Sequence, residues 1–194
     1  SYIVKYLEKD TNQVLTLNKV VENQVYESTV TEKAIDIEGY NAVEPLEQSL
    51  KIGLEENVIT FYYIKKTDLS YTVKYVEDGT DIEIAPSKLV ENQKYQSQVT
   101  EQAIDVARYN KLDPTSKTLT IAISGNEIVF YYAKRTDLEY TVNYLEQESL
   151  EKLAESKVVT GQTYKAEAIE HAIDIAGYDK VNPEERITID VENN

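Results

Sequence analysis

Apolar and polar residues alternate along the segment Tyr71–Val76. Tyr71, Val73 and Tyr75 fall on one face of an extended chain, whereas Lys74 falls on the other. Side chains of a β-strand point alternately to its two faces. The period of two therefore predicts a strand whose tyrosine face is buried and whose Lys74 points outward.

A second segment, Val58–Tyr63, is apolar on both faces. Ile59, Phe61 and Tyr63 share one face, and Tyr62 lies on the other. A strand that is apolar on both sides is typical of the middle of a covered sheet. Its β-branched and aromatic residues also favour strand structure. We therefore expect this segment to be a central strand.

One short helix is predicted from a different spacing. Val30, Ala34 and Ile37 recur at helical intervals, and Thr29-x-x-Glu32 resembles a capping box, in which a Thr and a Glu three residues apart satisfy the first amides of a helix. These signals predict a short helix over Val30–Ile37, between strands.

The sixteen tyrosines recur at steps of 69 residues. Tyr2, Tyr71 and Tyr140 form one such series, and each of the other tyrosines belongs to a similar one. Residues 2–69 align without a gap on residues 71–138, with 33 identities in 68 positions. The chain is therefore a tandem array, and the repeat is the unit to interpret.

The repeat divides the chain into three units, 1–69, 70–138 and 139–194, which we call repeats 1, 2 and 3. Repeat 3 is truncated before the counterpart of Ile59–Tyr63. If that segment is a central strand, its loss leaves backbone groups of two neighbouring strands unpaired. We expect residues after Pro183 to be shifted, poorly ordered, or completed by strand exchange with a neighbouring chain.

Two turn positions can be predicted by comparing the repeats. Asn23 and Asn92 are replaced by Gly161, and Asn and Gly are the residues that best tolerate a positive φ. We therefore expect a left-handed turn at this position. The position of Gly39 cannot require a positive φ as strictly, because repeat 2 has Arg108 there.

Charge excludes two classes of partner. The chain has 35 acidic and 20 basic residues, giving a formal net charge of −15. Such a chain cannot neutralise phosphates broadly, so we expect no nucleic-acid partner and no binding to anionic bilayers. Its apolar stretches are far shorter than the roughly 20 residues of a membrane span, so no membrane insertion is expected.

Catalysis and metal binding have little support. The chain has no cysteine, and its one histidine, His171, has no counterpart in the other repeats. The densest acidic cluster comprises Glu77, Asp78, Asp81 and Glu83, without the alternating oxygen ligands and glycine of a calcium loop. We therefore predict that the chain is not an enzyme and has no catalytic residue, no cofactor and no metal ion.

The repeats contain a spaced set of Tyr, Gly and Val residues. The set comprises Tyr71-Thr72-Val73-Lys74-Tyr75-Val76-Glu77-Asp78-Gly79, Glu91-Asn92-Gln93 followed by Tyr95, Gly39-Tyr40 and Gly177-Tyr178, and Ile128-Val129-Phe130-Tyr131-Tyr132. This set resembles the MucBP (mucin-binding protein) repeat of Gram-positive cell-surface adhesins. The resemblance implies an α+β, β-rich fold of tandem ubiquitin-like β-grasp modules, each a mixed sheet with one short helix. Because the two connections between repeats are short and alike, we expect an elongated rod of roughly 90–100 Å.

Six residues are candidates for weak glycan binding. Tyr62 and Tyr131 lie opposite the predicted core face, and sugars stack on exposed aromatic rings. The paired basic residues follow the same strand in repeats 1 and 2. The complete set is Tyr62, Tyr131, Lys65, Lys66, Lys134 and Arg135.

The sequence thus predicts a non-enzymatic, extracellular repeat region on the cell surface or wall of a Gram-positive bacterium. In this interpretation it projects a distal domain and makes weak multivalent contacts with mucin or other host glycans. The alternative is a structural spacer without a ligand. The net charge disfavours binding of sialylated or sulfated glycans, so that neutral sugars, local basic spots or bridging cations are required.

Overall fold

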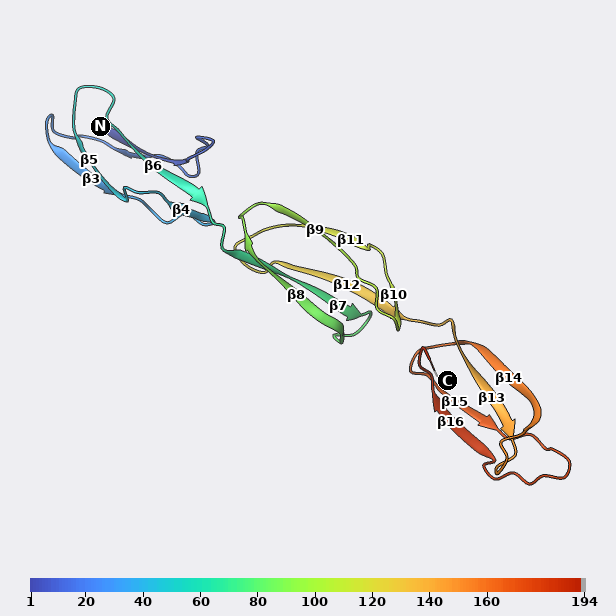
Figure 1. The fold of residues 1–194 in the computed structure, drawn as a ribbon. Coiled ribbons are helices and arrows are strands. Elements are labelled where there is room, and N and C mark those ends of the chain that lie inside the picture. The colour runs from blue at the N-terminus through green and yellow to red at the C-terminus, as the bar shows by residue number, and fades with distance from the viewer. Residues whose placement is uncertain (193–194) are drawn as a thin grey trace. The chain divides into compact units, whose positions relative to one another are not determined.

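The computed structural model describes residues 1–192, and these form strands, turns and loops without a helix (Figure 1). In chain order the strands are β1 (Tyr2–Glu8), β2 (Lys19–Val21), β3 (Thr29–Lys33), β4 (Tyr40–Ala42), β5 (Glu47–Lys51), β6 (Val58–Lys65), β7 (Leu69–Glu77), β8 (Glu83–Gln93), β9 (Gln98–Gln102), β10 (Tyr109–Lys111), β11 (Ser116–Thr120), β12 (Glu127–Lys134), β13 (Leu138–Leu145), β14 (Lys152–Gln162), β15 (Glu167–His171) and β16 (Glu184–Thr188). Accordingly, no helix that could cross a membrane occurs among the described residues.

The chain forms two compact units, whose boundary falls inside repeat 2. Unit 1 comprises Ser1–Val73, Lys88–Glu101 and Lys117–Ile128. Unit 2 comprises Lys74–Ser87, Gln102–Ser116 and the residues from Val129 onward. Repeat 1 therefore lies within unit 1, and the described part of repeat 3 lies within unit 2. The division into three domains and the elongated rod stay predictions from the sequence.

Repeat 1 contains a four-stranded sheet of order β2-β1-β6-β4. β1 pairs in parallel with β6, so that Val4 lies opposite Ile59 and Tyr6 opposite Phe61. β4 pairs with the other edge of β6 in the antiparallel direction. The central position predicted for the Val58–Tyr63 segment is therefore confirmed in repeat 1.

A second layer, formed by β3 and β5, covers one face of this sheet. These two strands pair in the antiparallel direction and lie side by side in Figure 1. Val30 of β3 and Leu50 of β5 pack on a buried cluster that includes Val4, Phe61 and Tyr63. The tyrosine face of the first strand is buried in repeat 2 as well, since Tyr71 and Tyr75 are at most 5% exposed.

The predicted helix and the β-grasp fold are wrong, because the described chain is all-β. The segment expected to be helical begins with β3, in which exposed Thr29 and Thr31 alternate with the more buried Val30 and Glu32. β-branched residues favour this pleated geometry. The spacing of the apolar residues looked helical because Val30 in β3 and Ala34 and Ile37 in the loop after it all pack against the same core.

Repeat 3 contains the pairs β13–β14 and β15–β16, and no described residue forms a counterpart of β6. The shift expected after Pro183 is wrong for the described residues. β16 pairs with β15 so that Glu167 lies opposite Thr188, as Thr29 lies opposite Lys51 in repeat 1. Residues 193–194, which the same prediction included, lie outside the described part.

The predicted turn position is confirmed in all three repeats. Asn23, Asn92 and Gly161 have φ values of 56°, 57° and 71°. At the other compared position Gly39 has a φ of 82°, whereas Arg108 does not have a positive φ. The backbone conformation at this second turn therefore differs between repeats 1 and 2.

Candidate functional site

The candidate site in repeat 1 is the face of the sheet that points away from the core. β6 alternates strictly, so its buried residues Phe61 and Tyr63 face the core and Tyr62 lies on the opposite face. In the neighbouring strand Leu7 is directly opposite Tyr62. On the other side, the amide of Val43 donates to the Tyr62 carbonyl oxygen at 2.8 Å. Tyr62 thus sits between two aliphatic neighbours, and its side chain is 40% exposed.

Repeat 2 presents the equivalent tyrosine in the same way. Tyr131 of β12 is 42% exposed, and its strand neighbours Phe130 and Tyr132 are buried. The amide of Leu112 donates to the Tyr131 carbonyl oxygen at 3.0 Å, as Val43 does to Tyr62. Each aromatic ring is therefore held on a strand whose opposite face is fixed in a core.

The strands that carry Tyr62 and Tyr131 are anchored by the hydroxyl groups of the neighbouring buried tyrosines, Tyr63 and Tyr132. Tyr63 Oη donates to the Ile35 carbonyl oxygen at 3.0 Å and accepts from the Ile35 amide at 3.1 Å. Tyr132 Oη donates to the Ile104 carbonyl oxygen at 3.0 Å. A buried tyrosine with a satisfied hydroxyl fixes the strand in depth and direction.

Two of the basic candidates are turned toward carboxylates instead of forming a site with these tyrosines. Lys65 lies on the core side of β6, opposite in direction to Tyr62, and its Nζ is 3.9 Å from Glu8 Oε1. Lys134 Nζ is 3.2 Å from Glu77 Oε1. Neutralised in this way, they offer an anionic sugar little attraction.

Glu77 is a structural carboxylate with a second partner. Tyr109 Oη donates to Glu77 Oε2 at 2.9 Å. Burial alone would raise the pKa of the Glu77 carboxyl, but the hydrogen bonds from Tyr109 and Lys134 outweigh it and lower the pKa. Burial and the contact with Glu77 raise the pKa of Tyr109 to about 12. Glu77, one member of the densest acidic cluster of the sequence, therefore bonds with other side chains of the fold.

The other two basic candidates lie in the connections between repeats. The Lys66 amide donates to the Gly39 carbonyl oxygen, and the Lys66 carbonyl oxygen accepts from the Tyr95 amide, each at 2.9 Å. Arg135 makes the same two backbone bonds, with Arg108 at 3.1 Å and with Tyr164 at 2.9 Å. Their backbones therefore tie each connection to the repeats on both sides.

The side chain of Arg135 is also engaged. Its Nε and one terminal nitrogen each donate to the Asp137 carboxylate at 2.9 Å. This two-point contact lowers the pKa of the Asp137 carboxyl. The structure therefore does not bring the basic candidates and the exposed tyrosines together into one site.

Tyrosine pairs accompany these connections. The rings of Tyr40 and Tyr95 meet edge to face, with centroids 5.8 Å apart and an interplanar angle of 79°. Tyr109 and Tyr164 repeat the arrangement at 5.7 Å and 73°. Tyr26, the counterpart of Tyr95 and Tyr164, has no such partner ring among residues 1–192 and is 59% exposed. The two ring pairs, Tyr40 with Tyr95 and Tyr109 with Tyr164, are therefore contacts between neighbouring repeats.

Sequence reasoning missed a polar cluster that recurs once in each repeat, buried in repeat 1 and partly buried in repeats 2 and 3. In repeat 1, Glu32 accepts from Tyr2 Oη at 2.5 Å and from Lys19 Nζ at 2.7 and 2.9 Å. The counterparts make the same contacts: Tyr71, Lys88 and Glu101 in repeat 2, and Tyr140, Lys157 and Glu170 in repeat 3. We call each set a Tyr–Glu–Lys cluster.

The Tyr–Glu–Lys cluster perturbs its carboxylate in a consistent direction. In repeat 1 burial would raise the pKa of Glu32, but the hydrogen bonds from Lys19 and Tyr2 prevail and lower it. In repeat 2 the hydrogen bonds from Lys88 and Tyr71 lower the pKa of Glu101. All members of a cluster are satisfied by one another, so the cluster holds the first and third strands of a repeat together.

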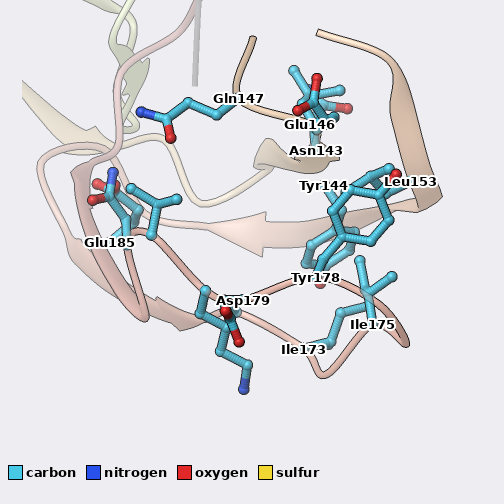
Figure 2. Close-up of a pocket in the computed structure, with 15 residues that line it drawn as sticks. Asn143, Tyr144, Glu146, Gln147, Leu153, Ile173, Ile175, Tyr178, Asp179 and Glu185 are labelled. Carbon is cyan, nitrogen blue, oxygen red and sulfur yellow. The ribbon is translucent and has the colours of Figure 1, made fainter. Parts of the chain in front are cut away.

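The third repeat contains a cavity of about 470 Å³. Figure 2 shows residues of its lining, among them Tyr144, Leu153, Tyr178 and Asp179. The lining of this cavity contains no histidine, and His171 lies outside it. His171 is largely exposed, with its Nδ1 3.9 Å from Glu184 Oε2.

No family model matches the chain, and no curated protein matches it. Several solved structures are distantly similar, and three of them each match over 69% of this chain. These three are the type 2 repeat of the mucus binding protein MUB from Lactobacillus reuteri (11% identity, TM-score 0.26, 98% of that chain), Mub-RV (14% identity, TM-score 0.26, 98% of that chain), and the Streptococcal High Identity Repeats in Tandem (SHIRT) domains 3-4 from a cell surface protein (13% identity, TM-score 0.24, 96% of that chain).

Proposed function

We propose that this chain is a non-enzymatic repeat region of a Gram-positive cell-surface adhesin and that it makes weak, repeated contacts with neutral sugars of mucin or other host glycans. The observation that carries the proposal is the recurrence of Tyr62 and Tyr131. Both are exposed, both lie on rigid central strands, and both stand at the same position of successive repeats. The resemblance of the sequence to the MucBP repeat agrees with it.

The chemistry of the site suits neutral sugars better than acidic ones. A tyrosine ring offers a flat apolar surface for the C–H face of a pyranose, with little entropy to lose. The nearby Lys65 and Lys134 are paired with carboxylates, and the chain carries a net charge of −15. Each contact is weak, but two contacts on one chain gain avidity when the glycan also repeats.

A structural spacer remains the second candidate, because the connections have features of their own that favour it. Lys66 and Arg135 bond through their backbones to the repeats before and after them. Such connections suit a region whose task is to separate two ends, with extracellular placement in either case.

Binding of the full chain to a mucin-coated surface and to a neutral glycan array, at two salt concentrations, tests the proposal. The double variant Tyr62→Ala, Tyr131→Ala should weaken binding at least about fivefold, since one aromatic stacking contact is worth roughly 1 kcal/mol. Tyr26→Ala is the matched control, because Tyr26 is exposed but lies outside the sheet face. Equal binding by both variants, or binding no greater than that of a charge-matched protein, would favour the spacer.

A further inference from the structure

The first and last strands of repeat 1 lie side by side and run in the same direction. β1 and β6 pair in parallel from Ile3 opposite Val58 to Glu8 opposite Tyr63. Because the pair is parallel, the chain enters repeat 1 at one end of this ladder and leaves it at the other end, about 20 Å away. Tension between the two ends of repeat 1 therefore pulls β1 and β6 in opposite directions along each other.

Both ends of this ladder are closed by backbone hydrogen bonds. The Ile3 amide donates to the Asn57 carbonyl oxygen, and the Lys9 amide donates to the Tyr63 carbonyl oxygen, at 2.9 Å each. When two paired strands are pulled along each other, every hydrogen bond between them is loaded at once, whereas strands pulled apart from one end lose these bonds one after another. Tension along the chain of repeat 1 must therefore break the whole ladder together.

Side chains anchor both strands near the points where tension enters and leaves repeat 1. Tyr2, at the start of β1, donates through its hydroxyl to Glu32 of β3. Tyr63, near the end of β6, bonds through its hydroxyl to both the amide and the carbonyl oxygen of Ile35. A slip of β1 by one residue would also turn the fully buried Val4 toward solvent. The two strands are therefore held against sliding by more than their ladder.

Repeat 2 contains the same arrangement, made by its own strands. β7 and β12 are neighbours in one sheet. The Thr72 amide donates to the Asn126 carbonyl oxygen at 3.0 Å, and the Asp78 amide donates to the Tyr132 carbonyl oxygen at 2.8 Å. These bonds are the counterparts of the two closing bonds in repeat 1. The Tyr132 hydroxyl again donates to a backbone carbonyl oxygen, that of Ile104, at 3.0 Å. The arrangement therefore occurs in both repeats.

We propose that repeats 1 and 2 are tension-bearing modules, in which the ladder between the first and last strands acts as a mechanical clamp. Such a clamp resists forces applied along the chain more strongly than forces that open the ladder from one end. A stalk that projects an adhesive domain and a structural spacer are both pulled along the chain, so this function goes beyond glycan binding and does not depend on it. Because forced unfolding is governed by the unfolding rate, the clamp acts by slowing unfolding under load.

Single-molecule force spectroscopy of the full chain tests the clamp. The chain has no cysteine, so two introduced cysteines define where repeat 1 is pulled. Ser1→Cys with Asp68→Cys loads β1 and β6 along each other, whereas Asp10→Cys with Asp68→Cys pulls at the two strand ends that lie beside each other and opens the ladder from there. At the same loading rate the first pair should unfold at a force at least about twofold higher. Equal forces, or a lower force for the first pair, would overturn the proposal.

A pair of variants, pulled in the first direction, tests the ladder itself. Lys5→Pro removes an amide that faces β6, as the Ile3 amide does two residues earlier, and Lys5→Ala is the control because it loses the same side chain and keeps the amide. Lys5→Pro should lower the unfolding force at least about 1.5-fold relative to Lys5→Ala, and equal forces would contradict the clamp. If Lys5→Pro prevents repeat 1 from folding, Tyr63→Phe takes its place with Tyr62→Phe as its control, since only the Tyr63 hydroxyl anchors β6 to the Ile35 backbone. Equal forces for these two variants would contradict the proposal as well.

Discussion

Replacing Glu32 with alanine should destabilise repeat 1 by more than the loss of its ion pair with Lys19 alone. The Glu32 side chain is 10% exposed and accepts hydrogen bonds from Tyr2 and Lys19. Glu32→Ala leaves the buried Tyr2 hydroxyl without its acceptor, which costs about 1–3 kcal/mol. Loss of the pair with the half-exposed Lys19 adds at most about 1 kcal/mol. We expect a total of about 1–4 kcal/mol.

Two further variants show which contact carries this free energy. Lys19→Gln removes the ion pair alone and should cost at most about 1 kcal/mol. Tyr2→Phe removes the hydroxyl together with its need for an acceptor. The double variant Tyr2→Phe, Glu32→Ala should therefore be less destabilised than the sum of its single variants, by about 1 kcal/mol.

Native-state hydrogen exchange at the β3 amides is the suitable assay, because it reports the opening free energy of repeat 1 separately from the other repeats. The reasoning fails if Glu32→Ala costs no more than Lys19→Gln. It also fails if the free energies of Tyr2→Phe and Glu32→Ala simply add, since the hydroxyl and the carboxylate would then be independent.

Three further predictions concern the packing of Gly39, the hydroxyl group of Tyr63 and the carboxylates of the Tyr–Glu–Lys clusters. Gly39→Ala places a Cβ 2.2 Å from a ring carbon of Tyr95 at a φ of +82°, whereas Gly79→Ala has a φ of +71° and no atom within 4 Å. Gly79→Ala should therefore cost only the roughly 1–2 kcal/mol of a left-handed backbone, and Gly39→Ala should cost more because it also disrupts the packing of Tyr95 on Gly39. Hydrogen exchange at the Tyr95 amide measures the difference. Tyr63→Phe should cost about 1–2 kcal/mol and Tyr62→Phe at most about 0.5 kcal/mol in denaturant unfolding, since only Tyr63 uses its hydroxyl in the core. The free energy of unfolding should fall as the pH drops below about 4.5, because the carboxylates of the Tyr–Glu–Lys clusters have lowered pKa values in the folded state, so that the unfolded chain takes up protons first. A free energy of unfolding that is constant from pH 6 to pH 3 would contradict this.

Much of the sheet could be predicted from local patterns, because burial acts on alternate residues of each strand. The face of Tyr71 and Tyr75, the central place of β6 and the positive φ at Asn23 all followed from spacing or from comparison of the repeats. These features depend on neighbours in the sequence or on the period of the chain, which the sequence displays directly.

The helix was predicted wrongly because its signals had another cause. Glu32 has the spacing of a capping residue, but its partners lie 30 and 13 residues away in the sequence, at Tyr2 and Lys19. A local pattern cannot contain such contacts. The usable signal was that all three residue types recur together at steps of 69. The separation of Tyr62 from Lys65 was visible in the alternation of β6, but the carboxylate beside Lys65 was not.

The two solutions at the Gly39 position imply that neighbouring repeats are matched to one another. Gly39 leaves room for Tyr95, whereas Arg108 covers the Tyr164 ring at 5.7 Å and pairs with Asp190 at 3.1 Å. The counterparts of Asp190 are Gly53 and Ala122, so neither of the other repeats offers this partner. Recombination that reordered the repeats would therefore keep each fold and lose a specific contact between neighbours, which makes the serial order of the array itself an inherited property.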